Sequence, residues 1–63
     1  MLKENVTKYR TQLGISILEL SRRSKVSRDV LYQIEKGKKN NVQMFTIERI
    51  AKALNVTIQD LIK

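Results

Sequence analysis

Apolar residues along the chain return at helical spacing. One clear stripe consists of Met44, Ile47, Ile50, Ala51 and Leu54, and Phe45 lies off it. No stretch sustains the alternation of apolar and polar residues that is typical of a strand. The pattern therefore predicts an all-α fold of five short helices in which this stripe faces the core. The predicted helices are Lys3–Leu13, Ile17–Ser24, Arg28–Lys36, Met44–Leu54 and Ile58–Ile62.

Three of the predicted helices begin with one shared local pattern. An apolar residue precedes a Ser or Thr, and a Leu follows four residues after that hydroxyl. The Ser or Thr suits an N-cap, which accepts an otherwise unpaired backbone N–H, and the two apolar residues suit a hydrophobic staple. The segments are ISILEL at 15–20, VSRDVL at 26–31 and VTIQDL at 56–61.

Acidic residues are expected to form capping boxes at two of these helix starts. Glu19 stands three residues after Ser16, where its carboxylate can return to the backbone of Ser16 and form a capping box. Asp60 is placed in the same way relative to Thr57, but its side chain is one methylene shorter, so we expect a weaker box there. The second start has Val30 at this position and therefore no box.

Helix ends are indicated by residues that tolerate a left-handed backbone. Gly14 and Gly37 follow two of the predicted helices, and Asn55 can take the same conformation after a third. The remaining helix ends near Ser24 and Lys25. A left-handed residue at that position, without glycine, should be strained by about 1 kcal/mol.

The charge balance is strongly basic. Thirteen Lys and Arg residues oppose six Asp and Glu residues, which gives a net charge of +7 over 63 residues. Such an excess favours a polyanionic partner, whether nucleic acid, anionic membrane or acidic protein, over a charge that serves solubility alone. His and Cys are absent, so the usual zinc ligands and several common catalytic groups are missing. We expect no metal, no cofactor and no enzymatic activity.

Length and hydropathy indicate a small soluble protein. The chain allows one domain over 1–63, without a linker or second domain. No apolar run approaches the roughly 20 residues of a transmembrane helix. The segment MLKENVTKYR lacks the apolar core of a signal peptide. We expect a cytoplasmic protein, and the capped starts and Gly stops argue against one long membrane-active helix.

The predicted helix from Arg28 to Lys36 has two distinct faces. Only the segment KVS separates it from the helix before it, so the two must cross steeply, as in a helix-turn-helix. Val30, Leu31 and Ile34 fall on the side that faces the core. The opposite side carries long or planar hydrogen-bonding groups of the kinds that read base edges. These residues are Arg28, Asp29, Tyr32, Gln33 and Lys36.

Cations gather around this helix. Seven of them lie between positions 22 and 39, with two acids among them, and they bracket the helix at both ends. Phosphates flank a DNA groove in the same way, although a solvated basic face would also look like this. The cations are Arg22, Arg23, Lys25, Arg28, Lys36, Lys38 and Lys39.

The segment LGISILELSRRSKVSRDVLYQIEKGK resembles the helix-turn-helix of the Cro/phage-repressor (XRE) family. The matching motifs are Leu13-Gly14, Glu19-Leu20-Ser21, Val26-Ser27 and Ile34-Glu35-Lys36-Gly37, and IAKALNVTIQDLI matches the family's fourth and fifth helices. The family usually has Ala at Ser21, Gly at Lys25 and often Pro at Val42. Ser21 is small enough to keep the helices close, whereas Lys25 puts the turn under mild strain and adds a candidate phosphate contact.

The resemblance implies functional roles. Arg28, Asp29, Tyr32 and Gln33 occupy the base-reading positions. Asp29 either orients Arg28 or accepts from a cytosine, and Tyr32 contacts a thymine methyl or a phosphate. The expected phosphate contacts are Ser16, Ile17, Arg22, Arg23, Lys25, Ser27, Lys36, Lys38, Lys39 and Asn40. A helix-joining ion pair is expected between Arg10 and Glu35, with two unrelated surface charges as the alternative.

The implied function is a DNA-binding transcriptional regulator of the repressor type. Specific binding normally needs two recognition helices, hence a homodimer on a palindromic operator, either stable or formed only on DNA. Candidate interface residues are Val42, Phe45, Ile58 and Ile62. An antitoxin or anti-regulator that binds a protein partner through the same fold is the alternative, and RNA binding also stays open.

Overall fold

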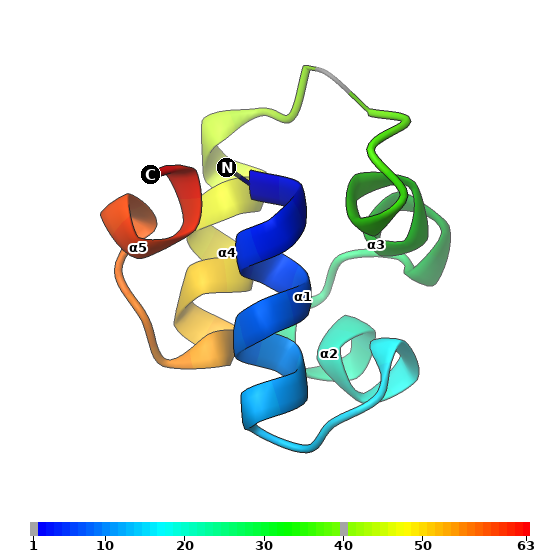
Figure 1. The fold of residues 1–63 in the computed structure, drawn as a ribbon. Coiled ribbons are helices and arrows are strands. Elements are labelled where there is room, and N and C mark those ends of the chain that lie inside the picture. The colour runs from blue at the N-terminus through cyan, green and yellow to red at the C-terminus, as the bar shows by residue number, and fades with distance from the viewer. Residues whose placement is uncertain (1, 40) are drawn as a thin grey trace.

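The computed structural model describes residues 2–39 and 41–63, and this part of the chain is all-helical. In chain order the elements are α1 (Leu2–Gln12), α2 (Ile17–Ser24), α3 (Arg28–Glu35), α4 (Met44–Leu54) and α5 (Ile58–Ile62). The predicted all-α fold is confirmed, and the predicted boundaries differ from these by one residue at most. Figure 1 shows α1 in front of α4, with α2 and α3 on one side and α5 on the other.

The core draws on every helix. Leu20, Leu31 and Leu61, which close the three shared start patterns, are each 0% exposed. Ile15 and Val56, which open two of these patterns, pack against the same cluster. The local pattern at each helix start therefore also directs one leucine into the centre of the molecule. The buried apolar residues are Val6, Leu20, Val26, Leu31, Ile34, Ile47, Ile50, Ala51, Leu54 and Leu61.

One residue of the predicted core stripe lies at the surface. Met44 is 56% exposed, whereas Ile47, Ile50 and Leu54 on the same stripe are buried. Met44 is the first residue of α4, and helical spacing sets the direction of a side chain without setting how far the neighbouring helices extend. The prediction that Met44 faces the core is therefore wrong.

The three predicted hydroxyl caps are present. Of the two expected capping boxes, only the one at α5 forms, although the weaker box was expected there. The hydroxyls of Ser16, Ser27 and Thr57 accept from the backbone N–H three residues ahead, at 3.0, 3.2 and 3.0 Å. The complete capping box forms at α5, where the Asp60 carboxylate accepts from the Thr57 N–H at 3.0 Å.

The expected box at α2 is not formed. The Glu19 carboxylate accepts from Arg22 and Arg23 instead. Two guanidinium groups within reach make stronger, charge-assisted bonds to a carboxylate than a neutral backbone N–H does. The shorter Asp60 side chain turns back to the backbone, and this hydrogen bond is the main cause that lowers the pKa of its carboxyl.

The helix ends follow the expectation for left-handed residues. Gly14, Lys25, Gly37 and Asn55 have φ values of 68°, 63°, 73° and 64°. Lys25 donates its backbone N–H to the carbonyl of Ser21 at 2.9 Å and so ends α2 in a strained conformation that glycine would adopt freely. Of these four residues, Lys25 is the one in the turn that brings α2 and α3 across one another.

Candidate nucleic-acid interface

The turn between α2 and α3 is held by two serines. The Ser21 hydroxyl donates to the carbonyl of Val26 at 2.6 Å, and the hydroxyl of the buried Ser24 accepts from the N–H of Val26 at 3.2 Å. The backbone N–H and carbonyl of Val26 are thus both hydrogen-bonded within the protein, which lets its side chain enter the core. Ser21 does more than provide a small side chain, which was the only role expected of it.

A polar cluster behind α3 joins it to α1. Arg10 makes a bidentate pair with Glu35, with Nε to Oε2 at 2.7 Å and Nη2 to Oε1 at 2.9 Å. Arg10 Nη1 also donates to the carbonyl of Ile15 at 2.9 Å, and the Thr7 hydroxyl donates to Glu35 Oε1 at 3.0 Å. The expected ion pair is therefore present, and Thr7 is a member that the sequence did not indicate.

This cluster is largely shielded from solvent. The side chains of Arg10 and Glu35 are 16% and 9% exposed. The hydrogen bond to Glu35 raises the pKa of the Arg10 guanidinium above its ordinary value, despite an opposing effect of burial. A charged pair in this setting, with its remaining hydrogen-bonding groups satisfied, holds the end of α3 at a defined distance from α1.

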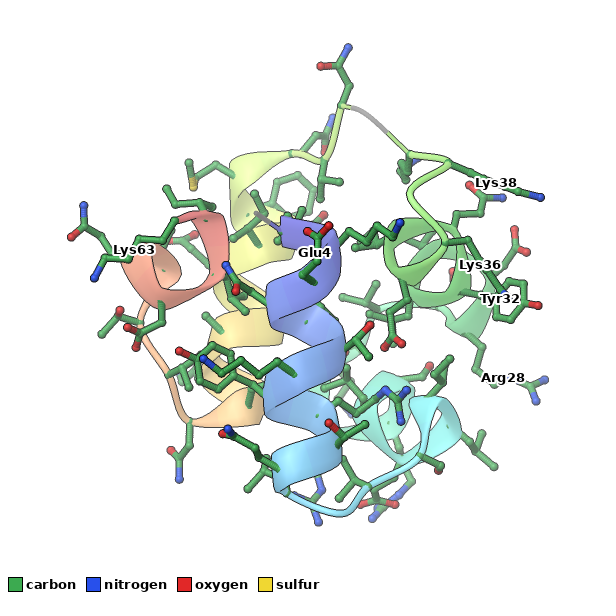
Figure 2. All side chains as sticks on the ribbon, in the orientation of Figure 1. Glu4, Arg28, Tyr32, Lys36, Lys38 and Lys63 are labelled. Atoms are coloured by element: carbon green, nitrogen blue, oxygen red, sulfur yellow. The ribbon has the colours of Figure 1, made fainter. Side chains whose placement is uncertain are left out.

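The outer face of α3 does not pack against the hydrophobic core. Leu31 and Ile34 point into the core, whereas Arg28, Asp29 and Tyr32 are exposed. Lys36 is also exposed, and Gln33 is half-buried. Figure 2 shows Arg28, Tyr32 and Lys36 extending from α3 to one side of the molecule, and Lys38 extends to that side from the loop that follows.

Two contacts run along this face, each linking residues one helical turn apart. Gln33 Nε2 donates to Asp29 Oδ2 at 3.2 Å, and Lys36 Nζ lies 5.2 Å from the centre of the Tyr32 ring. The Asp29 carboxylate accepts from Gln33, a contact that neither expected role of Asp29 included. Within the described residues, the side chain of Arg28 makes no hydrogen bond or ion pair.

A family model for the helix-turn-helix matches residues 6–61. The chain belongs to the XRE-type helix-turn-helix family. The family is a DNA-binding regulatory one and is typically non-enzymatic, and this chain is a DNA-binding helix-turn-helix regulator. Comparisons with curated proteins and with solved structures gave no match. None of the described helices has the length and apolar character needed to cross a membrane.

The helix N-termini of the helix-turn-helix meet at one open groove. Ser16, Ile17 and Leu18 line it from the start of α2, and Ser27 and Arg28 line it from the start of α3. Tyr32, Asp29 and Arg10 complete the lining. Backbone N–H groups at helix starts attract anions, so this groove can receive a phosphate.

The predicted phosphate-contacting cations fall into two groups. Arg22 and Arg23 of the helix-turn-helix both bond to Glu19, at 2.6 and 2.7 Å. These bonds lower the pKa of the Glu19 carboxyl and raise that of Arg22. A second group is exposed and has no ion pair within the part of the chain that the structure describes, and it consists of Lys25, Lys36, Lys38 and Lys39. Asn40, also predicted to contact phosphate, lies outside the described residues.

The predicted interface residues differ in exposure. Phe45 and Ile62 are 53% and 44% exposed, whereas Val42 and Ile58 are half-buried and pack against the core. The guanidinium carbon of Arg49 lies 5.5 Å from the centre of the Phe45 ring. Phe45 and Ile62 are therefore the two members with substantial free apolar surface.

Proposed function

We propose that the protein is a sequence-specific transcriptional regulator of the repressor type, which places α3 in the major groove of double-stranded DNA. One observation carries this proposal. The outer face of α3 presents Arg28, Asp29, Tyr32 and Gln33 without a role in the core, and their chemistry matches base edges. Arg suits guanine, Gln suits adenine, and a carboxylate suits the cytosine amine.

The surroundings of α3 support its use as a recognition helix. The major groove is about 12 Å wide and admits an α-helix. Arg10 and Glu35 anchor the inner side of α3, so the outward side chains start from a defined backbone position. Phosphate contacts are proposed on both flanks. On one flank are the starts of α2 and α3 with Ser16, Ile17, Ser27 and Lys25, and on the other are Lys36, Lys38 and Lys39.

We further propose that two copies bind one operator. A single recognition helix spans only a few base pairs, and a two-fold dimer places two of them about 34 Å apart on one face of the duplex. The exposed side chains of Phe45 and Ile62, with the edges of Val42 and Ile58, form the proposed contact between copies.

The direct test is a selection of bound duplexes from random DNA with the purified chain. We expect enrichment of an inverted repeat whose half-sites are centred about one helical turn, 10–10.5 base pairs, apart. Recovery of no preferred sequence would contradict sequence-specific binding. Recovery of a single half-site would contradict the two-fold arrangement.

Substitutions separate base reading from phosphate contact. Arg28→Ala and Gln33→Ala should each cost about 1–3 kcal/mol at the selected site and relax the preference at one base pair. Lys38→Ala should weaken binding to all duplexes alike. Affinities for the selected site and for a scrambled duplex, measured at one salt concentration, decide between these roles. Equal behaviour of the three variants would show that the assignment of roles is wrong.

A further inference from the structure

The contact between Asp29 and Gln33 constrains how Gln33 can present its amide. The two residues stand one turn apart on α3, and Gln33 Nε2 lies 3.2 Å from Asp29 Oδ2. A carboxylate offers only acceptors, so an amide that faces it must do so with its NH₂ group. Gln33 is also half-buried, which limits the rotamers available to it. The amide therefore has one preferred orientation on the outer face of α3.

This orientation leaves a specific pattern for a partner. With one N–H directed to Asp29, Gln33 retains its second N–H as a donor and Oε1 as an acceptor. Adenine presents the complementary pair in the major groove, with N7 as acceptor and the N6 amine as donor. Guanine presents two acceptors, N7 and O6, and Gln33 in this orientation has one donor left for them.

The negative charge of Asp29 acts in the same direction. Its carboxylate lies beside the Gln33 amide, where it would repel the electron-rich O6 of a guanine but not the N6 amine of an adenine. The Arg28 side chain has no such contact, because it makes no hydrogen bond or ion pair within the described residues. On the outer face of α3, the Gln33 amide is thus held in place, whereas the Arg28 guanidinium is not.

We propose that Asp29 is a positioning residue that fixes the Gln33 amide so that α3 selects adenine over guanine at the base pair Gln33 contacts. The proposal rests on the proposed function, since it presumes that α3 reads the major groove. It differs from a direct role of Asp29 as an acceptor for a cytosine amine. In that arrangement Asp29 and Gln33 would specify two different base pairs and act independently.

The test compares the wild type with Asp29→Asn, Gln33→Ala and the double variant. Each is bound to duplexes in which every base pair of the selected half-site is replaced in turn. Asn has the shape of Asp but can present either an oxygen or an NH₂ group, so it does not fix the Gln33 amide. We expect both single substitutions to reduce the adenine-over-guanine ratio at the same base pair by roughly fivefold or more. The double variant should lose no more of this ratio than Gln33→Ala alone.

A control removes a comparable charge elsewhere. Glu4 is an acid in the first turn of α1, as Asp29 is in the first turn of α3, and Figure 2 shows it apart from the outer face of α3. Glu4→Gln should leave the base ratio unchanged. Lost charge or lost helix stability in Asp29→Asn would change the affinity for all duplexes together, which the ratio at one base pair does not register.

Other outcomes overturn the inference. If Asp29→Asn alters a cytosine preference at a separate base pair and its effect multiplies with that of Gln33→Ala, Asp29 reads its own base. If Asp29→Asn weakens all duplexes equally, its role is structural. A wild-type protein that shows no sequence preference would instead refute the proposed function itself, so the two failures are distinguishable.

Discussion

Lys25 ends α2 in a left-handed conformation, with φ 63°. The Cβ atom of the lysine makes this conformation unfavourable, whereas glycine, which has no Cβ, adopts it without that penalty. Lys25→Gly should therefore raise the free energy of unfolding by about 1 kcal/mol. Denaturant unfolding at neutral pH, monitored by helical circular dichroism, measures this change.

Asn55 provides the matched control for this prediction. It ends α4 with φ 64°, and asparagine tolerates the left-handed region better than other non-glycine residues. Asn55→Gly should therefore stabilise the protein less than Lys25→Gly does. A Lys25→Gly variant with no gain in stability would show that the turn carries no strain from the lysine.

Some contacts of single residues were predictable from the sequence, and others were not. The caps at Ser16, Ser27 and Thr57 were predictable because each depends on atoms three residues apart. The partners of Glu19 and Asp29 were not, because each carboxylate has several acceptable donors within one turn. The choice among them depends on rotamers, which the pattern of residue types does not contain.

At the scale of the helices, the contact between α1 and α3 rests on Arg10, Glu35 and Thr7. Removing one partner of a shielded pair leaves the other charge without compensation, which costs more than losing both partners does. Arg10→Met and Glu35→Leu should each destabilise the fold by about 2–4 kcal/mol. The double variant should be less destabilised than the sum of the two, as measured by denaturant unfolding of all four proteins.

The comparison of the two single variants with the double variant also shows whether Arg10 and Glu35 stabilise the fold as a pair or separately. Additive losses in the double variant would indicate that Arg10 and Glu35 act independently, contrary to their bidentate geometry. Thr7→Val serves as a control, since it removes one hydroxyl from Glu35 and leaves both charges in place. Its effect should be smaller than that of either charged residue.

The elements were more predictable from the sequence than the contacts between them. Hydrophobic spacing and local end residues placed all five helices to within one residue at each end, because both features act within one or two turns. The exposure of Met44 depends instead on how far other helices reach, and the contribution of Thr7 depends on where α3 lies relative to α1. Both are consequences of packing between elements distant in the chain.

Over the whole molecule, the net charge of +7 includes some cations that are already paired with acids. Arg10 is paired with Glu35, and Arg22 and Arg23 share Glu19. Lys36 and Lys38 extend from the α3 side, and Lys63 lies on the opposite side of the molecule (Figure 2). Three of the arginines are therefore engaged by acids of the chain, and the total charge overstates the number of cations without an acidic partner.

This distribution predicts the salt dependence of DNA binding. The logarithm of the binding constant should fall with the logarithm of salt concentration by about 0.9 per phosphate contacted, giving a slope of several units. Lys38→Ala should reduce the slope by about 1, whereas Lys63→Ala should leave it unchanged. Titrations of one duplex at several salt concentrations measure the slopes, and a response independent of salt would contradict binding through phosphates.

The hydroxyl caps have a consequence for the speed of folding. Three of the five helix starts are closed by bonds that span only three residues, and each can form before the rest of the chain is ordered. Helical domains dominated by such short-range contacts fold within microseconds to milliseconds, because little loop entropy is lost before the first native contacts form. A chain with this design spends little time with its leucines exposed after synthesis, which limits its opportunity to aggregate.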